Sequence, residues 1–501
     1  MWMAVKRGIV VAIGLLIQIL LTLFIYLKFG EFISIIQVVY GLLSIIIVLM
    51  IIKYSKRLSN DLIWILLIML FPLIGTLLYI ILSNNMKRSK VLKNINENIE
   101  KGQKYLIQDE FIKKEIDTKN LGQLKYISEF AGFPVTKNNE INYYSLGDDV
   151  YPVMLEELKK AKKFIFIEYF IINNGTMWQG ILDILKEKAN SGLDVRVLYD
   201  DMGSVAMQPS NYPKLLEKYG IKCMQFNKLS PFAGIIMNNR DHRKMMIIDG
   251  HTAFSGGINI SDEYININSK LGVWKDNGIR IKGEAVWNFT VMFLEMWNSF
   301  KKEDNDYNKY KYNFTEKYKE NGFVVPYGES PLDDVITGED IYLNIINQAK
   351  KYVYIYTPYL IIDTDMINSL ILAARRGVDV RIVVPGIPDK KIVYDLTSSY
   401  FYTLIKGGVK IYTYTNGFVH SKVFLSDDEI ATVGTINLDY RSLYLHFECG
   451  IYMKDTNVIK DIKKDFEDSF KESHKVEEKE SKTGLFKGLW QAILRLFAPM
   501  M

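Results

Sequence analysis

Cysteine, histidine and an excess of one charge are all scarce in this sequence. Two cysteines in 501 residues exclude a disulfide framework and any metal site with four thiolate ligands. The formal net charge is only +5, which excludes the clustered basic excess of a protein whose main partner is nucleic acid. The five histidines show no metal-ligand spacing, so we expect neither a metal nor another cofactor. The chain is nevertheless 49% apolar, which excludes a disordered protein, and its length predicts two or more domains.

Long uncharged runs dominate residues 1–86. Runs at 8–27, 32–52 and 62–86 each have about 20 residues or more, the length needed to cross a bilayer. No small-x-small cleavage site follows the first run, so we expect it to be retained rather than removed as a signal peptide. Basic clusters flank every run, and three crossings cannot place all of them on one side. Residues 1–86 are therefore predicted to be a membrane anchor with two or three transmembrane helices, and Pro72 and Gly75 are the expected break in the third run.

The rest of the chain is predicted to be α/β, with two duplicated halves. After a charged connector at 87–125, short β-branched and aromatic runs alternate with amphipathic stretches. Three blocks recur in the same order: 161–167 resembles 349–355, 192–197 resembles 377–382, and 220–222 resembles 408–410. We place the halves at 126–315 and 316–458. A charged linker at 459–483, which the sequence allows to be a solvated helix or a flexible connector, and an amphipathic, interfacial C-terminal helix at 484–501 are expected to follow.

One motif occurs once in each half with identical spacing. The pattern His-x-Lys-x(4)-Asp-x(6)-Gly-x-x-Asn begins at His242 and again at His420. Its first copy contains His242, Lys244, Asp249 and Asn259, and its second contains His420, Lys422, Asp427 and Asn437. Chance is a poor explanation for two such copies in a chain with five histidines.

The residue types in this motif suit phosphodiester chemistry. In a strand, residues i and i+2 share a face, so each His and its Lys can point at the same phosphate. Imidazole acts as a nucleophile or as a general acid and base near neutral pH, and lysine offsets the charge of the phosphate oxygens. Two sets can hold one phosphodiester from opposite sides, with one His attacking phosphorus and the other protonating the leaving oxygen. This chemistry requires no metal.

With these motifs, the chain resembles the phospholipase D superfamily and, within it, the bacterial cardiolipin synthases. The resemblance extends to the apolar N-terminal runs, to HRKMMIIDGHTAFSGGINISDEYIN around the first motif, to Trp274-Lys275-Asp276 and to GTINLDYRSLYLHFE. It implies that one phosphatidylglycerol loses glycerol to form a phosphatidyl-histidine. A hydroxyl of a second phosphatidylglycerol then attacks that intermediate and yields cardiolipin.

The resemblance also implies roles for individual residues. His242 is favoured as the nucleophile and His420 as the acid and base, while Lys244, Lys422, Asn259 and Asn437 hold the phosphate oxygens. A downstream carboxylate orients each imidazole, and we expect Glu448 to serve His420 and Asp276 to serve His242. Asp249 and Asp427 complete the two catalytic sets but are expected to support strand and loop rather than touch substrate. His251 and His446 are expected to be ordinary histidines outside the chemistry.

Phosphatidylglycerol and cardiolipin in the bilayer are the implied partners, and nucleic acid is not expected. We expect a multi-pass protein of the bacterial plasma membrane with its catalytic halves on the cytoplasmic side. A membrane-bound phospholipase D, or a phosphatidyltransferase with another acceptor, remains the alternative because the same motifs serve both. A membrane scaffold that only binds head groups is disfavoured, since both histidines, both lysines and both asparagines are present. The sequence leaves the oligomeric state open.

Overall fold

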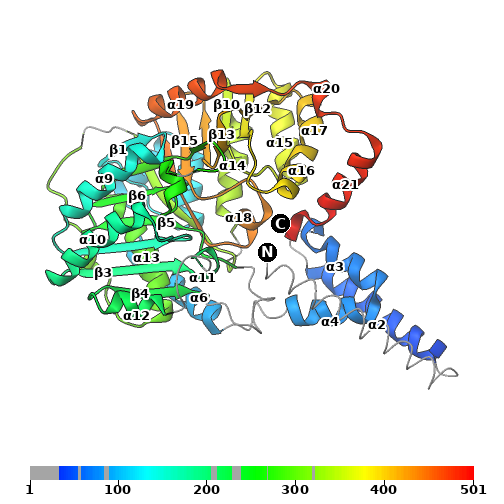
Figure 1. Ribbon diagram of the computed structural model, residues 1–501, viewed down its shortest axis with the longest axis horizontal. Coiled ribbons are helices and arrows are strands. Elements are labelled where there is room, and N and C mark those ends of the chain that lie inside the picture. Colours follow the sequence, from blue (N-terminus) through cyan, green and yellow to red (C-terminus); the bar gives the residue numbers. More distant parts are fainter. Residues whose placement is uncertain are drawn as a thin grey trace. The chain divides into compact units, whose positions relative to one another are not determined.

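The computed structural model describes residues 33–54, 58–83, 90–204, 211–227, 239–267, 269–318, 322–333 and 335–500 (Figure 1). The chain divides into two compact units, Met1–Ser89 and Lys90–Met501. The first predicted apolar run, 8–27, lies outside the described residues.

The described part of the first unit is helical. It contains α2 (Ile33–Tyr54), α3 (Leu58–Leu70) and α4 (Pro72–Ser83), which pack around Ile51, Ile65 and Ile68. The expected break in the third run lies between α3 and α4, where Pro72 occupies the first helical position that proline tolerates. Gly75 permits the close approach of the two helices, because a Cβ there would lie 2.4 Å from the Leu67 carbonyl oxygen. Among the helices that the structure describes, none has the length and apolar character required for a membrane span.

A helical connector begins the second unit. Its elements are α6 (Lys90–Gly102), η2 (Gln103–Tyr105), α7 (Glu110–Thr118), α8 (Gly122–Lys125) and the π-helical turn η3 (Tyr126–Phe130). Ile95 of α6 is fully buried and joins the main hydrophobic core, so the connector is part of the folded unit.

The first half is built on a seven-stranded sheet in the order β1-β8-β6-β5-β2-β3-β4. Its strands are β1 (Asn139–Tyr144), β2 (Phe164–Tyr169), β3 (Asp194–Asp200), β4 (Lys222–Phe226), β5 (Lys244–Ile248), β6 (Thr252–Gly256) and β8 (Gly278–Gly283). Helices cover this sheet as α9 (Gly147–Lys159), α10 (Thr176–Asn190), α11 (Asp201–Ser204), α12 (Tyr212–Glu217), η4 (Asp262–Ile265) and α13 (Val286–Phe300). Strands β2 and β5 are buried along their whole length, which explains their continuous apolar sequences.

The second half repeats this topology. Its sheet has the order β17-β12-β11-β10-β14-β15-β16-β9, the same succession with β17 added at one edge. The strands are β9 (Phe323–Glu329), β10 (Tyr352–Tyr356), β11 (Asp379–Pro385), β12 (Lys410–Tyr414), β14 (Val423–Ser426), β15 (Ile430–Gly434), β16 (Glu448–Lys454) and β17 (Ser473–Lys475). The helices are η5 (Asn308–Tyr310) before the half, then α14 (Thr337–Gln348), α15 (Thr364–Arg375), α16 (Lys391–Ser399), α17 (Phe401–Lys406) and α18 (Tyr440–Tyr444). The predicted duplication of α/β halves is confirmed.

The two halves share a core and one small sheet. Nearly every side chain of α13 is buried, and the cluster around it includes Met245 and Ile279 of the first half and Val423 and Ile451 of the second. Strand β7 (Val273–Lys275) of the first half pairs in parallel with β13 (Gly417–Val419) of the second. A separate two-stranded sheet therefore joins the halves just before the second motif.

Residues 459–483 are folded, which excludes the flexible linker and agrees with the alternative of a helix for their first part. They form α19 (Ile459–Lys471), β17 and α20 (Glu478–Ser481). Ile459, Ile462 and Phe466 of α19 are buried at helical spacing, and of its charged residues only Asp465 is buried, where it pairs with Lys275 at 2.6 Å. The expected C-terminal helix is present as α21 (Leu485–Leu496), followed by η6 (Ala498–Met500).

Candidate active site

The two motif histidines precede equivalent strands of the two sheets. His242 lies just before β5 and His420 just before β14, and each residue is only 7% exposed. The backbone N–H of His242 donates to the Phe447 carbonyl at 2.8 Å, and that of His420 donates to the Lys275 carbonyl at 2.8 Å. Each motif is thus held by a segment of the opposite half, which brings both motifs to one junction.

The orienting carboxylates are exchanged between the halves. Glu448 Oε1 and Oε2 each lie 2.8 Å from His242 Nδ1, and Asp276 Oδ2 lies 2.6 Å from His420 Nδ1. The expectation that Glu448 serves His420 and Asp276 serves His242 is therefore wrong, although both carboxylates were correctly selected. The backbone pairing explains the exchange, because Phe447 and Lys275 directly precede Glu448 and Asp276.

The two carboxylates are held differently. Thr435 Oγ1 donates to Glu448 Oε2 at 2.5 Å. At the equivalent place in the first half stands Gly257, where a Cβ would lie only 2.0 Å from Asp276 Oδ1. The Thr435 hydroxyl supports the longer glutamate, whereas the missing side chain of Gly257 leaves space for the aspartate. The two histidines are consequently not equivalent chemically.

Both imidazoles are neutral in the free protein. Burial, followed by the charge of Lys244, lowers the pKa of His242 well below its usual value. Burial, followed by the charge of Lys422, lowers the pKa of His420 to about 4. Lys422 also acts on the pKa of His242 and Lys244 on that of His420, so the two motifs form one electrostatic site. A neutral imidazole whose Nδ1 is bound to a carboxylate presents Nε2 as a nucleophile or base.

The motif lysines are buried beside the histidines. Lys244 Nζ donates to the His242 carbonyl at 2.7 Å, and Lys422 Nζ donates to the His420 carbonyl and lies 2.9 Å from His420 Nδ1. Burial lowers the pKa of Lys244 to about 8 and that of Lys422 to about 7. An anion placed between them would favour their charged forms.

These two lysines predict a loss of activity at alkaline pH. A lysine is positive below its pKa and neutral above it, so the ability to hold a phosphodiester is complete at acidic pH and declines as Lys422 and then Lys244 deprotonate. The low pKa of His420 already lowers kcat/KM above about pH 4, and we expect the fall to steepen between about pH 7 and pH 9 by up to tenfold per pH unit for each neutralised lysine. A kcat/KM profile on phosphatidylglycerol in mixed micelles measures this, and a profile that stays level to about pH 9 would contradict it.

The asparagines stand in different relations to the site. Asn259 is 1% exposed, accepts the Ile171 N–H at 3.1 Å and donates to the Tyr264 hydroxyl at 2.7 Å. The Tyr264 ring packs edge-on against His420 with the ring centroids 5.4 Å apart, so Asn259 contacts a side chain that borders the site. Asn437 is buried, and its Oδ1 has no hydrogen-bond partner among the described residues.

The motif aspartates lie at the far ends of the strands. Asp249 follows β5, and its carboxylate accepts the backbone N–H groups of Lys162, Lys163 and Phe164. Asp427 follows β14 and accepts those of Lys350, Lys351 and Tyr352. A five-residue strand separates Asp249 from its motif histidine by on the order of 15 Å. In both halves the aspartate therefore has the same structural role: its carboxylate binds the backbone N–H groups at the start of the neighbouring strand, β2 or β10.

Replacing Asp249 with alanine should therefore reduce stability rather than chemistry. Three backbone amides lose a charged acceptor, and that of Phe164 is half-buried, so we expect the free energy of unfolding to fall by about 1–3 kcal/mol. The melting temperature and the kcat of the folded enzyme are the measurements. Asp183→Ala is the control, since Asp183 is 71% exposed and pairs with Lys186, a residue of its own helix. A loss of kcat as large as that of a histidine variant would show that Asp249 takes part in the chemistry.

His446 is a third histidine in the site, contrary to the expectation that it is an ordinary histidine outside the chemistry. It is buried, its ring centroid lies 5.7 Å from that of His242, and its Nδ1 lies 3.8 Å from Glu448 Oε1. The equivalent position in the first half is Trp274, whose ring lies 5.9 Å from His420. Only the duplicated register reveals the correspondence, because His446 precedes Phe447 as Trp274 precedes Lys275.

His242, His446 and Glu448 are also the one set among the described residues with ligand atoms close enough to hold a metal ion, all within 4.8 Å. Both oxygens of Glu448 are engaged by His242, and one also accepts from Thr435. This arrangement orients an imidazole in the way that a nucleophile requires.

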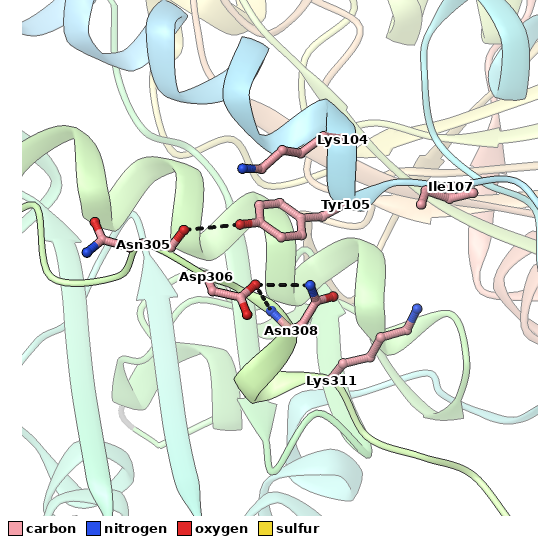
Figure 2. Close-up of a pocket in the computed structure, with 7 residues that line it drawn as sticks. All are labelled: Lys104, Tyr105, Ile107, Asn305, Asp306, Asn308 and Lys311. Carbon is pink, nitrogen blue, oxygen red and sulfur yellow. Dashed lines mark hydrogen bonds between the residues drawn. The ribbon is translucent and has the colours of Figure 1, made fainter.

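A surface hollow of about 420 Å³ lies elsewhere, between Lys104, Tyr105 and Ile107 on one side and Asn305, Asp306, Asn308 and Lys311 on the other (Figure 2). The Tyr105 hydroxyl closes one end by donating to the Asn305 carbonyl at 3.2 Å. None of these residues belongs to either motif, so the hollow is not the active site.

Comparison with known families agrees with this geometry. The family described as "Cardiolipin synthase, PLD-like domain" matches residues 154–297 and 342–470, which together exceed half of the chain and contain both motifs. The chain belongs to this cardiolipin synthase family. A second family, described as phospholipase D-nuclease N-terminal, matches residues 42–84.

Relatives of this cardiolipin synthase family member cover most of its length. Cardiolipin synthase 1 of Staphylococcus aureus is 36% identical over 82% of the chain and 85% of the relative. Cardiolipin synthase 2 of Staphylococcus epidermidis is 33% identical over 92% of the chain and 96% of the relative. An uncharacterized protein of Streptococcus mutans is 46% identical over 80% of the chain and 87% of the relative.

Among solved structures, a phosphatidylserine synthase of Haemophilus influenzae shares the fold of this family member. The match has a TM-score of 0.56 at 16% identity and covers 76% of the chain and 98% of that structure. It supports the arrangement of two α/β halves.

Proposed function

We propose that this protein is a cardiolipin synthase, a phosphatidyltransferase that uses two molecules of phosphatidylglycerol. The observation that carries the proposal is the pair of buried imidazoles, each oriented by a carboxylate of the opposite half, in a chain of the cardiolipin synthase family. Such a pair suits a reaction with two successive displacements at one phosphorus.

In the first displacement, His242 Nε2 attacks phosphorus and the bond from phosphorus to the glycerol oxygen breaks. His420 gives a proton to the departing oxygen, and glycerol leaves. The anionic phosphodiester raises the pKa of His420 from its low value in the free protein, which allows the imidazole to carry this proton. Glu448 stabilises the charge that develops on His242.

In the second displacement, a glycerol hydroxyl of another phosphatidylglycerol gives its proton to His420. Its oxygen attacks phosphorus, the bond from phosphorus to His242 breaks, and cardiolipin forms. Lys244, Lys422 and Asn437 offset the charge on the phosphate oxygens in both displacements. Confinement of both lipids to one surface favours the lipid hydroxyl over water.

We place the enzyme in the cell membrane, as a multi-pass protein whose catalytic unit is on the cytoplasmic side. The uncharged runs of residues 1–86 and the N-terminal family match support this placement. Large apolar side chains of α2, among them Val38 and Leu49, are exposed. Cysteine labelling at 53–57 and 87–93 in intact cells tests the topology, and labelling from outside at 87–93 would contradict it.

Product analysis tests the activity. Purified full-length protein is incubated, without added metal, with vesicles that contain labelled phosphatidylglycerol. We expect cardiolipin and glycerol in equal amounts. Phosphatidic acid as the sole lipid product would instead identify a hydrolase, the alternative that the two motifs also permit.

A further inference from the structure

Helix α21 is amphipathic, but its orientation is the reverse of that of a normal surface helix. Its exposed apolar side chains cover a sector of about 140° at 100° per residue. They are Leu485, Phe486, Leu489, Trp490 and Ile493, exposed by 44% to 87%, with Phe497 directly after the helix. A helix that packed for stability alone would turn this sector toward the protein.

The polar sector of α21 holds it against the second half. Gln491 is 5% exposed and donates to the Asp395 carbonyl and to Ser398 Oγ, both at 3.2 Å. Arg495 Nε donates to Ser399 Oγ at 2.9 Å, and its guanidinium lies 4.5 Å from the centre of the Tyr400 ring. Leu494 and Ala498 anchor the same side in the core. These contacts fix α21 beside α16 (Figure 1). The apolar side chains of α21 remain exposed.

Residues near α16 add to this surface. Ile387 and Ile392 are exposed by 39% and 52%, and Lys390 and Lys391 between them are exposed as well, with Lys390 3.6 Å from Asp389. Lys487 is exposed in the first turn of α21, and Lys482, which precedes the helix, is exposed and pairs with Glu478 at 3.3 Å. We call these two isoleucines, the four lysines and the apolar sector of α21 with Phe497 the apolar–basic face.

We propose that the apolar–basic face is a docking surface for an anionic lipid bilayer and that α21 lies in the plane of that bilayer. Large apolar and aromatic side chains bordered by lysines are the composition of an interfacial helix. The lysines match the negative charge of a surface rich in phosphatidylglycerol. This choice of lipid rests on the proposed function, whose substrate is anionic.

The docking surface connects directly to the active site. Thr397 of α16 accepts the Leu360 N–H through its hydroxyl at 3.2 Å, and Leu360 bridges Leu438, the residue after Asn437. At the other end of α16, Asp389 accepts the Tyr359 hydroxyl at 2.8 Å, and its charge acts on Tyr264, the ring that packs on His420. Docking through α21 therefore holds the second motif at a fixed orientation to the lipid surface.

A depth measurement tests the proposal with the full-length protein. Both native cysteines are buried, so Leu489→Cys can carry an environment-sensitive fluorophore at a single accessible thiol. Leu372→Cys on α15 is the matched control, because Leu372 and Leu489 are both 56% exposed. In vesicles of phosphatidylglycerol and phosphatidylcholine with brominated acyl chains, we expect quenching at 489 and none at 372. Equal fluorescence with brominated and ordinary lipid at 489 overturns the proposal.

A pair of double variants tests the consequence for turnover. Phe486→Ser with Leu489→Ser removes two apolar side chains from the face, while Phe111→Ser with Leu372→Ser removes two of equal exposure elsewhere. We expect the first to lower activity on vesicles by about tenfold or more and to leave activity in detergent micelles within about twofold. The second should change neither activity. Equal vesicle activities for the two double variants overturn the proposal.

The outcomes separate docking from catalysis. Quenching at 489 in a protein without transferase activity keeps the docking surface and rejects the proposed function. Transferase activity without quenching keeps the function and rejects the docking surface. Crosslinking between copies through a cysteine at 489, or shielding of that cysteine without lipid, assigns the face to a second copy or to the first unit and likewise rejects the bilayer.

Discussion

His242→Ala and His420→Ala are each expected to reduce phosphatidyl transfer by about 10⁴-fold or more, because the two imidazoles act as one unit. Without His242 no nitrogen forms the covalent intermediate, and without His420 the leaving glycerol oxygen has no proton donor. Cardiolipin formation from labelled phosphatidylglycerol measures the loss. His474→Ala is the matched control, since His474 also pairs with a carboxylate, Glu480, but lies on the exposed edge strand β17.

A substrate with an activated leaving group assigns the two roles. In a phosphatidyl ester of p-nitrophenol, the leaving group departs as nitrophenolate and needs no proton. This substrate therefore removes the need for the general acid in the first displacement. We expect His420→Ala to release a burst of nitrophenolate and to retain an acid-labile lipid adduct. His242→Ala should give neither. The opposite pattern would identify His420 as the nucleophile, and normal turnover in either variant would reject the mechanism.

Glu448→Gln and Asp276→Asn are expected to reduce kcat by about 10³-fold to 10⁴-fold while the fold is preserved. Each amide keeps the size of the carboxylate but cannot stabilise the positive imidazole, and it can hold the wrong tautomer. The kcat on phosphatidylglycerol and the melting temperature are the measurements. Glu480→Gln is the control, because Glu480 pairs with His474 outside the site at 3.1 Å.

The activated ester also tests the exchange of carboxylates between the halves. Because Asp276 orients His420, the general acid, Asp276→Asn should still release a burst of nitrophenolate from the activated ester. Because Glu448 orients His242, the burst should remain weak in Glu448→Gln. Recovery in Glu448→Gln and loss in Asp276→Asn would mean that each carboxylate serves the histidine of its own half.

Local features of the chain predicted much of the fold. Alternating apolar runs and helical stretches predicted α/β halves, and the blocks around 161–167 and 349–355 correspond to β2 and β10 of the two sheets. The charged segment 459–483 was misjudged because its few apolar residues, such as Ile462 and Phe466, are separated by lysines and acids. The composition of such a helix is dominated by the charged residues of its outer face. Its burial depends instead on the spacing of its few apolar residues and on the surface against which they pack.

Sequence alone determined which residue types carry the chemistry. Two copies of one motif at equal spacing selected the histidines and lysines, and the resemblance selected Glu448 and Asp276. Tertiary structure alone decided which carboxylate meets which histidine. A hydrogen bond between side chains 206 residues apart leaves no trace in local pattern, since it depends on the backbone pairing of His242 with Phe447. Only the tertiary structure likewise places His446 in the site. It also decides which face of the amphipathic helix α21 packs against the protein, because the sequence pattern does not predict this.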